Sequence, residues 1–213
     1  MNNIKKAMQL YAVTDSDCLV NRTLAQATEE CLAAGATFLQ LREKDMPYSD
    51  FLAEARELAA IARRYDVPFV INDNIEIALE CGADGVHVGQ SDIKGRNIRE
   101  IIGADKILGI SAATVETALA AEKAGADYIG VGAVFPTSTK LDANLLNNER
   151  LCEICAAVSI PVVAIGGIGA ANVLQLKGSG IDGVAVVSAI FAQQDIPAAT
   201  KKLLLLTEEL LGE

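Results

Sequence analysis

Two cations and a glutamine stand together in the stretch Gln40-Leu41-Arg42-Glu43-Lys44, at the end of a short apolar run. The guanidinium of Arg42 is a planar fork of donors that matches phosphate oxygens, and the ammonium of Lys44 adds a point charge. Alternation along an extended chain places Gln40 and Arg42 on the same side. The stretch is therefore a candidate phosphate-binding segment, and a solvated charged turn is the alternative.

Carboxylates follow two further apolar runs, as Asn72-Asp73 and as Gln90-Ser91-Asp92. If these runs are neighbouring strands they lie about 5 Å apart, so that Asp73 and Asp92 can share one cation. Magnesium commonly takes one or two carboxylates, keeps several waters and completes its shell with substrate phosphate oxygens. We expect a Mg²⁺ site at Asp73 and Asp92. The alternative for Asp73 is to cap the next helix.

Two later segments favour anion binding. The first is Gly132-Ala133-Val134-Phe135-Pro136-Thr137-Ser138-Thr139-Lys140, where three hydroxyl residues precede a lysine. The second comprises Gly166-Gly167-Ile168-Gly169 and Ser188-Ala189, which follow the last two apolar runs. Glycines let backbone N–H groups approach an anion, and the ends of strands seven and eight are the recurrent phosphate site of (β/α)₈ barrels.

Other polar residues have two interpretations each. Ser111 follows the fifth apolar run, where it is either a ligand donor or the start of a helix near Thr114. The single histidine, His87, lies inside the fourth run, which favours an interior position over a general base. Cys152 and Cys155 have C-x-x-C spacing, but no second pair accompanies them, so we interpret them as ordinary helix positions. We find no Ser/His/Asp or Cys/His constellation in the sequence.

The elements that must position these residues alternate regularly. Eight short apolar runs occur at 9–13, 38–41, 68–71, 85–88, 107–110, 128–131, 162–165 and 183–187, with helical patterns between them. The clearest helical pattern is the apolar stripe Phe51, Ala55, Leu58, Ala62 and Tyr65. Eight strands alternating with helices predict a parallel sheet closed into a (β/α)₈ TIM barrel, and we expect one domain over 1–213.

An internal repeat supports the barrel. Gly35-Ala36-Thr37, Gly82-Ala83-Asp84, Gly125-Ala126-Asp127 and Gly180-Ile181-Asp182 each end a helix and lead into a strand. Glycine suits the left-handed cap of a helix, and the short polar residue then begins the next strand. The four copies precede strands two, four, six and eight, so the repeat unit is a quarter of a barrel.

Composition and charge narrow the partners. The chain has 213 residues, of which 51% are hydrophobic, and a formal net charge of −10. Such a charge repels nucleic acid and anionic membranes, so small molecules are the expected partners. No apolar stretch reaches the length that spans a membrane. The five cysteines and the absence of a secretory signal predict reduced thiols in the cytoplasm.

Taken together, the motifs resemble those of the thiamine phosphate synthase family. The resemblance rests on Gln40-Leu41-Arg42-Glu43-Lys44, Ile71-Asn72-Asp73, Gly85-Val86-His87-Val88-Gly89-Gln90-Ser91-Asp92, Val134-Phe135-Pro136-Thr137-Ser138-Thr139-Lys140 and Ala164-Ile165-Gly166-Gly167-Ile168. The motifs occur in family order from about Tyr11 to Ser188. The stretch 141–148 departs from the family pattern, because it lacks a run containing proline and glycine.

The resemblance implies substrates and a role for each residue. The substrates are hydroxymethylpyrimidine diphosphate and a thiazole phosphate or its carboxylated form, and Asp73 and Asp92 bind Mg²⁺. The pyrimidine diphosphate is held by Gln40, Leu41, Arg42, Glu43, Lys44, Asn72, Ser111 and Lys140, of which Arg42, Lys44, Ser111 and Lys140 are the catalytic set. The thiazole phosphate is held by Thr137, Ser138, Thr139, Gly167, Val187 and Ser188. The family also suggests a homodimer.

The expected mechanism is dissociative. Magnesium and the cations neutralise the departing pyrophosphate, and the thiazole nitrogen captures the resulting pyrimidine carbocation. Two alternatives share parts of this site. A thiazole tautomerase keeps the phosphate cradle at Gly167 and Ser188, and so does a non-catalytic thiazole phosphate-binding protein. Neither needs both Asp73 and Asp92, so the sequence favours the synthase.

Overall fold

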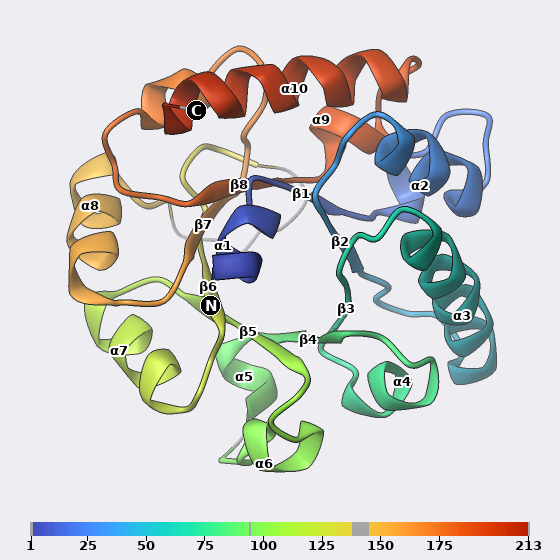
Figure 1. The fold of residues 1–213 in the computed structure, drawn as a ribbon, viewed down its shortest axis with the longest axis horizontal. Helices are drawn as coiled ribbons and strands as arrows, with labels where there is room; N and C mark the ends of the chain where they lie inside the picture. The colour runs from blue at the N-terminus through green and yellow to red at the C-terminus, as the bar shows by residue number, and fades with distance from the viewer. Residues whose placement is uncertain (1, 94, 138–144, 213) are drawn as a thin grey trace.

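Eight parallel strands close into one barrel, in which β8 pairs with β1 (Figure 1). The computed structural model describes residues 2–93, 95–137 and 145–212, of which 2, 3, 91 and 92 are described by their backbone alone. The strands are β1 (Leu10–Val13), β2 (Phe38–Leu41), β3 (Phe69–Asn72), β4 (Gly85–Val88), β5 (Ile107–Ala112), β6 (Tyr128–Gly132), β7 (Val162–Ile165) and β8 (Gly183–Val186). The predicted (β/α)₈ barrel is confirmed.

Helices surround the barrel (Figure 1). They are α1 (Asn2–Ala7), α2 (Leu24–Ala33), α3 (Tyr48–Arg64), α4 (Ile75–Glu80), α5 (Gln90–Ile93), α6 (Ile98–Ile102), α7 (Val115–Lys123), α8 (Asn148–Ala157), α9 (Ser188–Phe191) and α10 (Ile196–Leu211), with the 3₁₀ helix η1 at Ser16–Cys18. The predicted stripe of α3 is buried from Phe51 to Ala62. Between β7 and β8 the structure has only the 3₁₀ helix η2 (Val173–Leu176). The glycines of this connection disfavour a longer helix.

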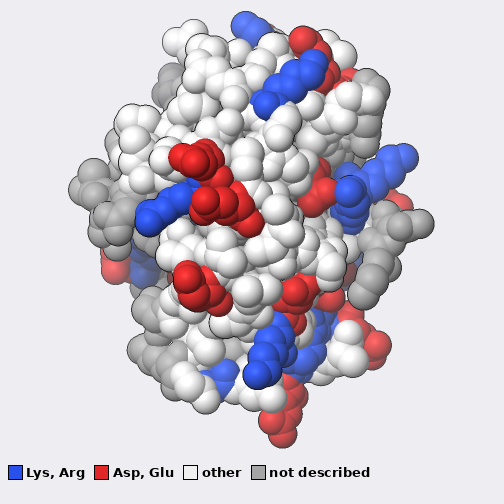
Figure 2. All heavy atoms as spheres, turned by 90° about the vertical axis from the view of Figure 1, so that its left-hand side faces the viewer, with Lys and Arg blue, Asp and Glu red and all other residues white. Residues whose placement is uncertain are grey.

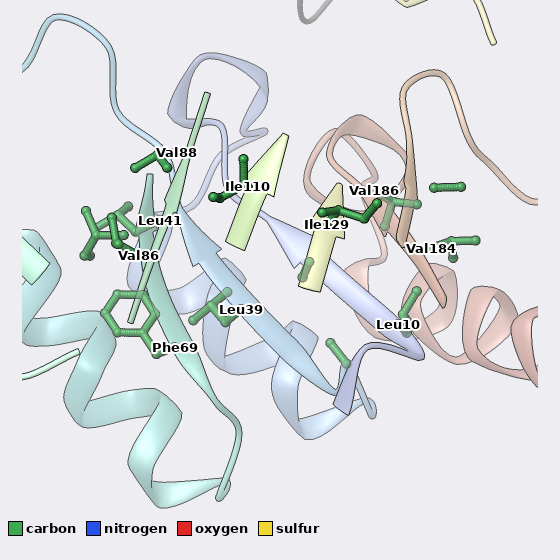
Figure 3. Packing of buried hydrophobic residues seen from close by; sticks show 14 of the residues in the cluster. Leu10, Leu39, Leu41, Phe69, Val86, Val88, Ile110, Ile129, Val184 and Val186 are labelled. Carbon is green, nitrogen blue, oxygen red and sulfur yellow. The ribbon is translucent and has the colours of Figure 1, made fainter. Parts of the chain in front are cut away.

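Strand side chains alternate between two buried layers. In β1, Leu10 and Ala12 belong to the outer layer beneath the helices, and Tyr11 and Val13 belong to the cluster inside the barrel. Figure 3 shows part of the outer layer, where Phe69 of β3 and aliphatic side chains of β1, β2, β4, β5, β6 and β8 are labelled. Burying each such side chain contributes about 1.5–3 kcal/mol. The outer layer therefore stabilises the barrel, and the inward positions are left for other chemistry.

The amino-terminal end of the barrel is closed by apolar side chains. Helix α1 crosses this end (Figure 1), where Ile4 and Ala7 pack against the interior cluster and Met8 is fully buried. Polar inward residues are instead found near the carboxyl ends of the strands, as Asn72 in β3 and Ser111 in β5 show. A ligand that enters the barrel therefore meets polar groups at the carboxyl end.

The four-fold sequence repeat corresponds to four hydrogen-bonded clamps between strands. A side-chain oxygen accepts the backbone N–H at the start of the preceding strand, from Leu10 to Thr37 (2.8 Å), Phe69 to Asp84 (2.8 Å), Leu108 to Asp127 (2.7 Å) and Val162 to Asp182 (2.8 Å). Gly35, Gly82 and Gly125 directly follow the C-caps of α2, α4 and α7 with φ of 109°, 70° and 83°, which confirms three of the predicted left-handed caps. Gly180 also has a positive φ, of 86°, but it does not end a helix, because η2 already ends at Leu176. The repeat thus joins the strands in pairs.

The clamp at Asp182 gives a stability prediction. Asp182→Ala leaves the buried N–H of Val162 without its acceptor and removes an ion pair with Lys5 (2.7 Å). We expect a loss of about 1.5–3 kcal/mol in the free energy of unfolding, measured by urea denaturation. Lys5→Ala is the control, with an expected cost of about 0–1 kcal/mol, because the Lys5 side chain is 68% exposed. Equal losses in the two variants would contradict the clamp.

The surface over α7 and α8 carries lysine, arginine, aspartate and glutamate side chains that are interspersed rather than gathered by sign (Figure 2). Within the described part of the chain, each helix is too short or too polar to cross a membrane.

Candidate active site

A cavity of about 540 Å³ opens at the carboxyl ends of β2 and β3. Its charged lining consists of three cationic side chains, from Arg42, Lys44 and Arg96, and three carboxylates, from Glu43, Asp73 and Glu76. Asn72 and Asn74 also line it, with Met46, Phe51 and Ile75. The structure therefore brings Arg42, Glu43, Lys44, Asn72 and Asp73 together at one cavity.

A larger cavity of about 690 Å³ lies at the opposite end of the barrel. It is lined by two of the glycine turns, at 35–37 and 82–84, and by residues such as Arg63, Asp66 and Lys106. In (β/α)₈ barrels the catalytic residues lie at the carboxyl ends of the strands, whereas the amino-terminal end serves stability. The smaller cavity is therefore the candidate active site.

Asp73 is held in a special backbone conformation. Its φ of 62° lies in the left-handed region, which Asp and Asn tolerate better than other residues with a Cβ. The following helix is capped by Asn74, whose Oδ1 accepts the N–H of Ile77 at 3.0 Å. The alternative that Asp73 caps this helix is therefore wrong. Its carboxylate is exposed at the cavity instead.

The Asp73 carboxylate joins the ends of β3 and β4. Its Oδ2 accepts from Nδ2 of Asn72 at 2.6 Å, and its Oδ1 faces the N–H of Gly89 at 3.4 Å. The backbone N–H of Asp73 donates to the carbonyl of His87 at 2.8 Å. A carboxylate oxygen at this junction is the type of ligand that Mg²⁺ selects. Asp92 lies in α5, directly after β4, and its side chain lies outside the described atoms.

Strand β2 presents its polar residues from inward positions. Gln40 is 4% exposed, and its Nε2 donates to the hydroxyl of Tyr11 at 2.6 Å. Leu41 faces the outer layer and is fully buried there, so only its main chain can contribute to the site. The N–H of Arg42 donates to Oγ1 of Thr14 at 3.0 Å, which fixes the backbone from which the guanidinium reaches the cavity.

The carboxylate of Glu43 accepts a hydrogen bond from another side chain of the protein. The hydroxyl of Ser16 donates to its Oε1 at 2.5 Å. Burial, followed by the charges of Glu43 and Glu57, raises the pKa of Glu54 in α3 to about 7. Among the described residues, no hydrogen-bond partner faces the buried Oε2 of ionised Glu54. When Glu54 carries a proton, its carboxyl group can donate a hydrogen bond to the carboxylate of Glu43. These contacts fix the side chain of Glu43 at the edge of the cavity.

Ser111 does not begin a helix. Thr114 caps α7. Its side-chain oxygen accepts the backbone N–H of Thr117, and the side-chain oxygen of Thr117 accepts the backbone N–H of Thr114. The hydroxyl of Ser111 instead lies 3.0 Å from Nε2 of His87, and the carbonyl of Ser111 accepts from Nε2 of Gln90 at 2.7 Å. His87 is 9% exposed inside the barrel, which confirms its predicted interior position. Ser111 and His87 meet because β4 and β5 are neighbours, and the other ring nitrogen of His87 lies beside the hydroxyl of Tyr128 rather than a carboxylate.

The loops after β6 and β7 contact each other closely. A Cβ at Gly167, whose φ is 64°, would lie 2.3 Å from the carbonyl oxygen of Pro136, so only glycine fits. Asn172 supports the turn, because its Nδ2 donates to the carbonyl of Gly167 at 2.9 Å and its Oδ1 accepts the N–H of Gly169 at 2.9 Å. The sequence did not single out Asn172 as a supporting residue.

The remaining predicted phosphate-binding residues fall near this turn. Val187 precedes α9, which Ser188 begins, and a Cβ at Gly169 would lie 3.8 Å from the Cβ of Ala189. Thr137 is the last described residue of the loop after β6. The structure thus gathers Gly167, Val187 and Ser188 at the ends of β7 and β8. Ser138, Thr139 and Lys140 lie outside the described residues, and their roles stay predictions.

Besides Asn172, sequence reasoning missed Arg96, Tyr11 and Tyr128. Arg96 lines the cavity with Arg42, although it stands eight residues after the end of β4. Tyr11 and Tyr128 lie inside the barrel, where their hydroxyls are 2.8 Å apart. A signal was present for the tyrosines, because a phenol at an inward strand position needs a hydrogen-bond partner.

Fold and site together define a (β/α)₈ barrel with a polar, charged cavity at the carboxyl ends of its strands. Residues 10–190 match the family model described as thiamine monophosphate synthase. The thiamine-phosphate synthase of Ruminiclostridium cellulolyticum is 55% identical over 195 residues, which cover 92% of this chain and 93% of that protein. The thiamine-phosphate synthase of Clostridium tetani is 47% identical, covering 95% and 97%.

A solved structure agrees with these relatives. Thiamine phosphate pyrophosphorylase from Pyrococcus furiosus superposes with a TM-score of 0.90 at 38% identity, covering 98% of this chain and 100% of that one. The chain therefore belongs to the thiamine monophosphate synthase family. It is an enzyme, a transferase of thiamine biosynthesis that forms thiamine phosphate from phosphorylated small molecules.

Proposed function

We propose that this enzyme joins hydroxymethylpyrimidine diphosphate to a thiazole phosphate, releasing pyrophosphate, with the assistance of Mg²⁺. The observation that carries the proposal is the single cavity shared by Arg42, Lys44, Asn72 and Asp73. The cationic side chains of Arg42 and Lys44 suit the diphosphate, and the carboxylate oxygens of Asp73 suit a divalent cation bound together with it. The thiazole substrate is the thiazole phosphate or its carboxylated form.

The diphosphate end of the substrate belongs in the cavity. Arg42 and Lys44 leave the end of β2 on the same side as Asn72, and Arg96 approaches from the segment after α5. Their charges offset the negative charge that grows on the departing pyrophosphate. Lys140 is proposed from the sequence as a further cation.

Magnesium would be held by Asp73 and, by the sequence prediction, Asp92. The fit rests on the exposed Asp73 carboxylate at the β3–β4 junction. When bound, the ion would supply neutralisation of the phosphate oxygens and orient the leaving group. The protein's part is to keep the carboxylate in place, through the bond from Asn72 and the left-handed backbone at Asp73.

The thiazole phosphate belongs at the ends of β7 and β8. Gly167 and Ser188 lie on adjacent strand ends, where backbone N–H groups can approach phosphate oxygens. Val187 and Thr137 border the same region, and Ser138 and Thr139 are proposed from the sequence. In this proposal the two phosphate groups would bind at different strand ends, with the inward residues of the barrel between them.

The bond changes need no covalent intermediate with the protein. The C–O bond between the pyrimidine methylene and the diphosphate breaks, and its electron pair leaves with pyrophosphate. The lone pair of the thiazole nitrogen then forms the new C–N bond. The role of the protein is to position two bound substrates and stabilise charge. A single barrel domain, a cytoplasmic location and a homodimer remain part of the proposal.

The decisive assay measures thiamine phosphate and pyrophosphate formed from the two substrates, with and without Mg²⁺. We expect stoichiometric release of pyrophosphate that depends on the metal. Isomerisation of the thiazole without pyrophosphate would instead identify a tautomerase. Binding of thiazole phosphate without turnover would identify a binding protein.

Arg96 provides a test of the cavity. We expect Arg96→Ala to raise the KM for the pyrimidine diphosphate about tenfold, because one charge-assisted contact contributes roughly 1.5 kcal/mol. The KM for the thiazole phosphate should be unchanged. Arg63→Ala, at the opposite end of the barrel, is the matched control and should change neither constant. Equal effects on both substrates would remove Arg96 from the diphosphate site.

A further inference from the structure

A chain of hydrogen bonds crosses the interior of the barrel from β2 to β5. Nε2 of Gln40 donates to the hydroxyl of Tyr11 at 2.6 Å, and this hydroxyl lies 2.8 Å from that of Tyr128. The Tyr128 hydroxyl lies 2.9 Å from Nδ1 of His87, whose Nε2 lies 3.0 Å from Oγ of Ser111. The chain therefore connects two predicted substrate-binding residues on opposite sides of the barrel.

Two glycines make room for this chain. A Cβ at Gly109 would lie 2.2 Å from Cζ of Tyr128 and 2.5 Å from Nδ1 of His87, so no other residue fits there. A Cβ at Gly130 would lie 3.1 Å from Cε1 of His87. Both glycines occupy inward positions, on β5 and β6. The Tyr128–His87 pair thus fills space that two neighbouring strands leave empty.

The hydrogen bonds of this interior chain all donate in one direction, from Gln40 toward Ser111. Burial raises the pKa values of Tyr11 and Tyr128 far above neutral, so each phenol keeps its single proton. The amide nitrogen of Gln40 can only donate, so the Tyr11 hydroxyl accepts from it and donates to Tyr128. Tyr128 must then donate to Nδ1 of His87. The other ring nitrogen of His87, Nε2, therefore carries the ring proton and donates to Oγ of Ser111.

We propose that Gln40, acting through Tyr11 and Tyr128, holds His87 as its neutral Nε2–H tautomer and thereby makes Ser111 a hydrogen-bond donor toward the substrate. Because Oγ of Ser111 accepts from His87, its own proton is free to point to a ligand acceptor. The opposite polarity would make Nε2 an acceptor and Ser111 a candidate nucleophile, as in a Ser–His pair. The functional half of this inference rests on the proposed function, and His87 is a positioning residue in it.

The tautomer can be observed directly, because the sequence contains a single histidine. Protein labelled with ¹⁵N-histidine gives one pair of ring nitrogen signals, and long-range ¹H–¹⁵N spectra at neutral pH distinguish the protonated from the unprotonated nitrogen. We expect Nε2 protonated and Nδ1 unprotonated. A protonated Nδ1, alone or together with Nε2, would overturn the proposal. The spectrum needs no substrate, so it stands even if the proposed reaction fails.

Removing one hydrogen bond of this interior chain tests whether the chain acts on Ser111. Tyr128→Phe removes the donor to His87 and keeps the ring, and we expect the tautomers to mix and kcat to fall about tenfold, with little change in KM. Tyr65→Phe removes a phenol that bonds Glu29 at the surface and is the matched control, with both readouts unchanged. In a Ser111→Ala background, Tyr128→Phe should cause no further loss of kcat. Independent, multiplicative losses would show that Tyr128 is merely structural.

Discussion

Asp73→Asn is expected to lower kcat by about 100-fold or more at saturating substrates, with an unchanged fold. A metal that neutralises a leaving group contributes several kcal/mol, and about 1.4 kcal/mol corresponds to each tenfold loss of rate. Asparagine keeps the size of the side chain and removes the charge that attracts the cation. It also tolerates the φ of 62°, so the variant separates the loss of charge from backbone strain.

Asp66→Asn is a close control for this experiment. Asp66 also has a left-handed φ, of 54°, but it lines the cavity at the opposite end of the barrel. We expect wild-type kcat and Mg²⁺ dependence from Asp66→Asn, and a raised Mg²⁺ requirement from Asp73→Asn. Near-wild-type turnover of the Asp73 variant over the whole range of Mg²⁺ would exclude Asp73 from the metal site.

The fold could be predicted because two independent periodicities agree. Short apolar runs identify the strands, and the glycine turns identify the pairs in which strands are joined. The errors lie at the strand ends, where Asn72 and Ser111 belong to β3 and β5 rather than to the loops after them. Polar residues at inward positions end an apolar run in the sequence, but they do not end the hydrogen-bonded strand. Strand length therefore cannot be taken from hydrophobicity alone.

The site could be predicted where it depends on neighbouring strand ends. Arg42, Asn72 and Asp73 come from consecutive strands, so barrel geometry alone brings them together. The hydrogen-bonded chain inside the barrel could not be predicted in this way, because Tyr11 and Tyr128 are 117 residues apart and meet only across the closed barrel. Helix capping was equally hard to assign, since Asp73 and Asn74 are both good caps and the backbone conformation decides between them.

The timing of bond breaking can be tested with altered substrates. If pyrophosphate leaves before the thiazole nitrogen bonds, positive charge develops on the pyrimidine methylene. A trifluoromethyl group in place of a ring substituent withdraws electrons and destabilises that charge. We expect the single-turnover rate to fall by about a thousandfold or more, which corresponds to roughly 4 kcal/mol of barrier. Binding should change little, because the diphosphate, which we propose to bind at Arg42 and Lys44, is the same in both substrates.

A direct displacement predicts a different result, since the nucleophile and the leaving group then share the charge and the ring substituent matters little. Rates that agree within a few-fold between the two pyrimidines would therefore exclude the dissociative mechanism. The fluorinated substrate also tests Ser111, because a donor that acts on the leaving group is needed whichever step comes first. Ser111→Ala should slow both pyrimidines by a similar factor if its hydroxyl assists departure. A loss confined to the natural pyrimidine would instead place the Ser111 donor at the ring, where the substituent changes the acceptor.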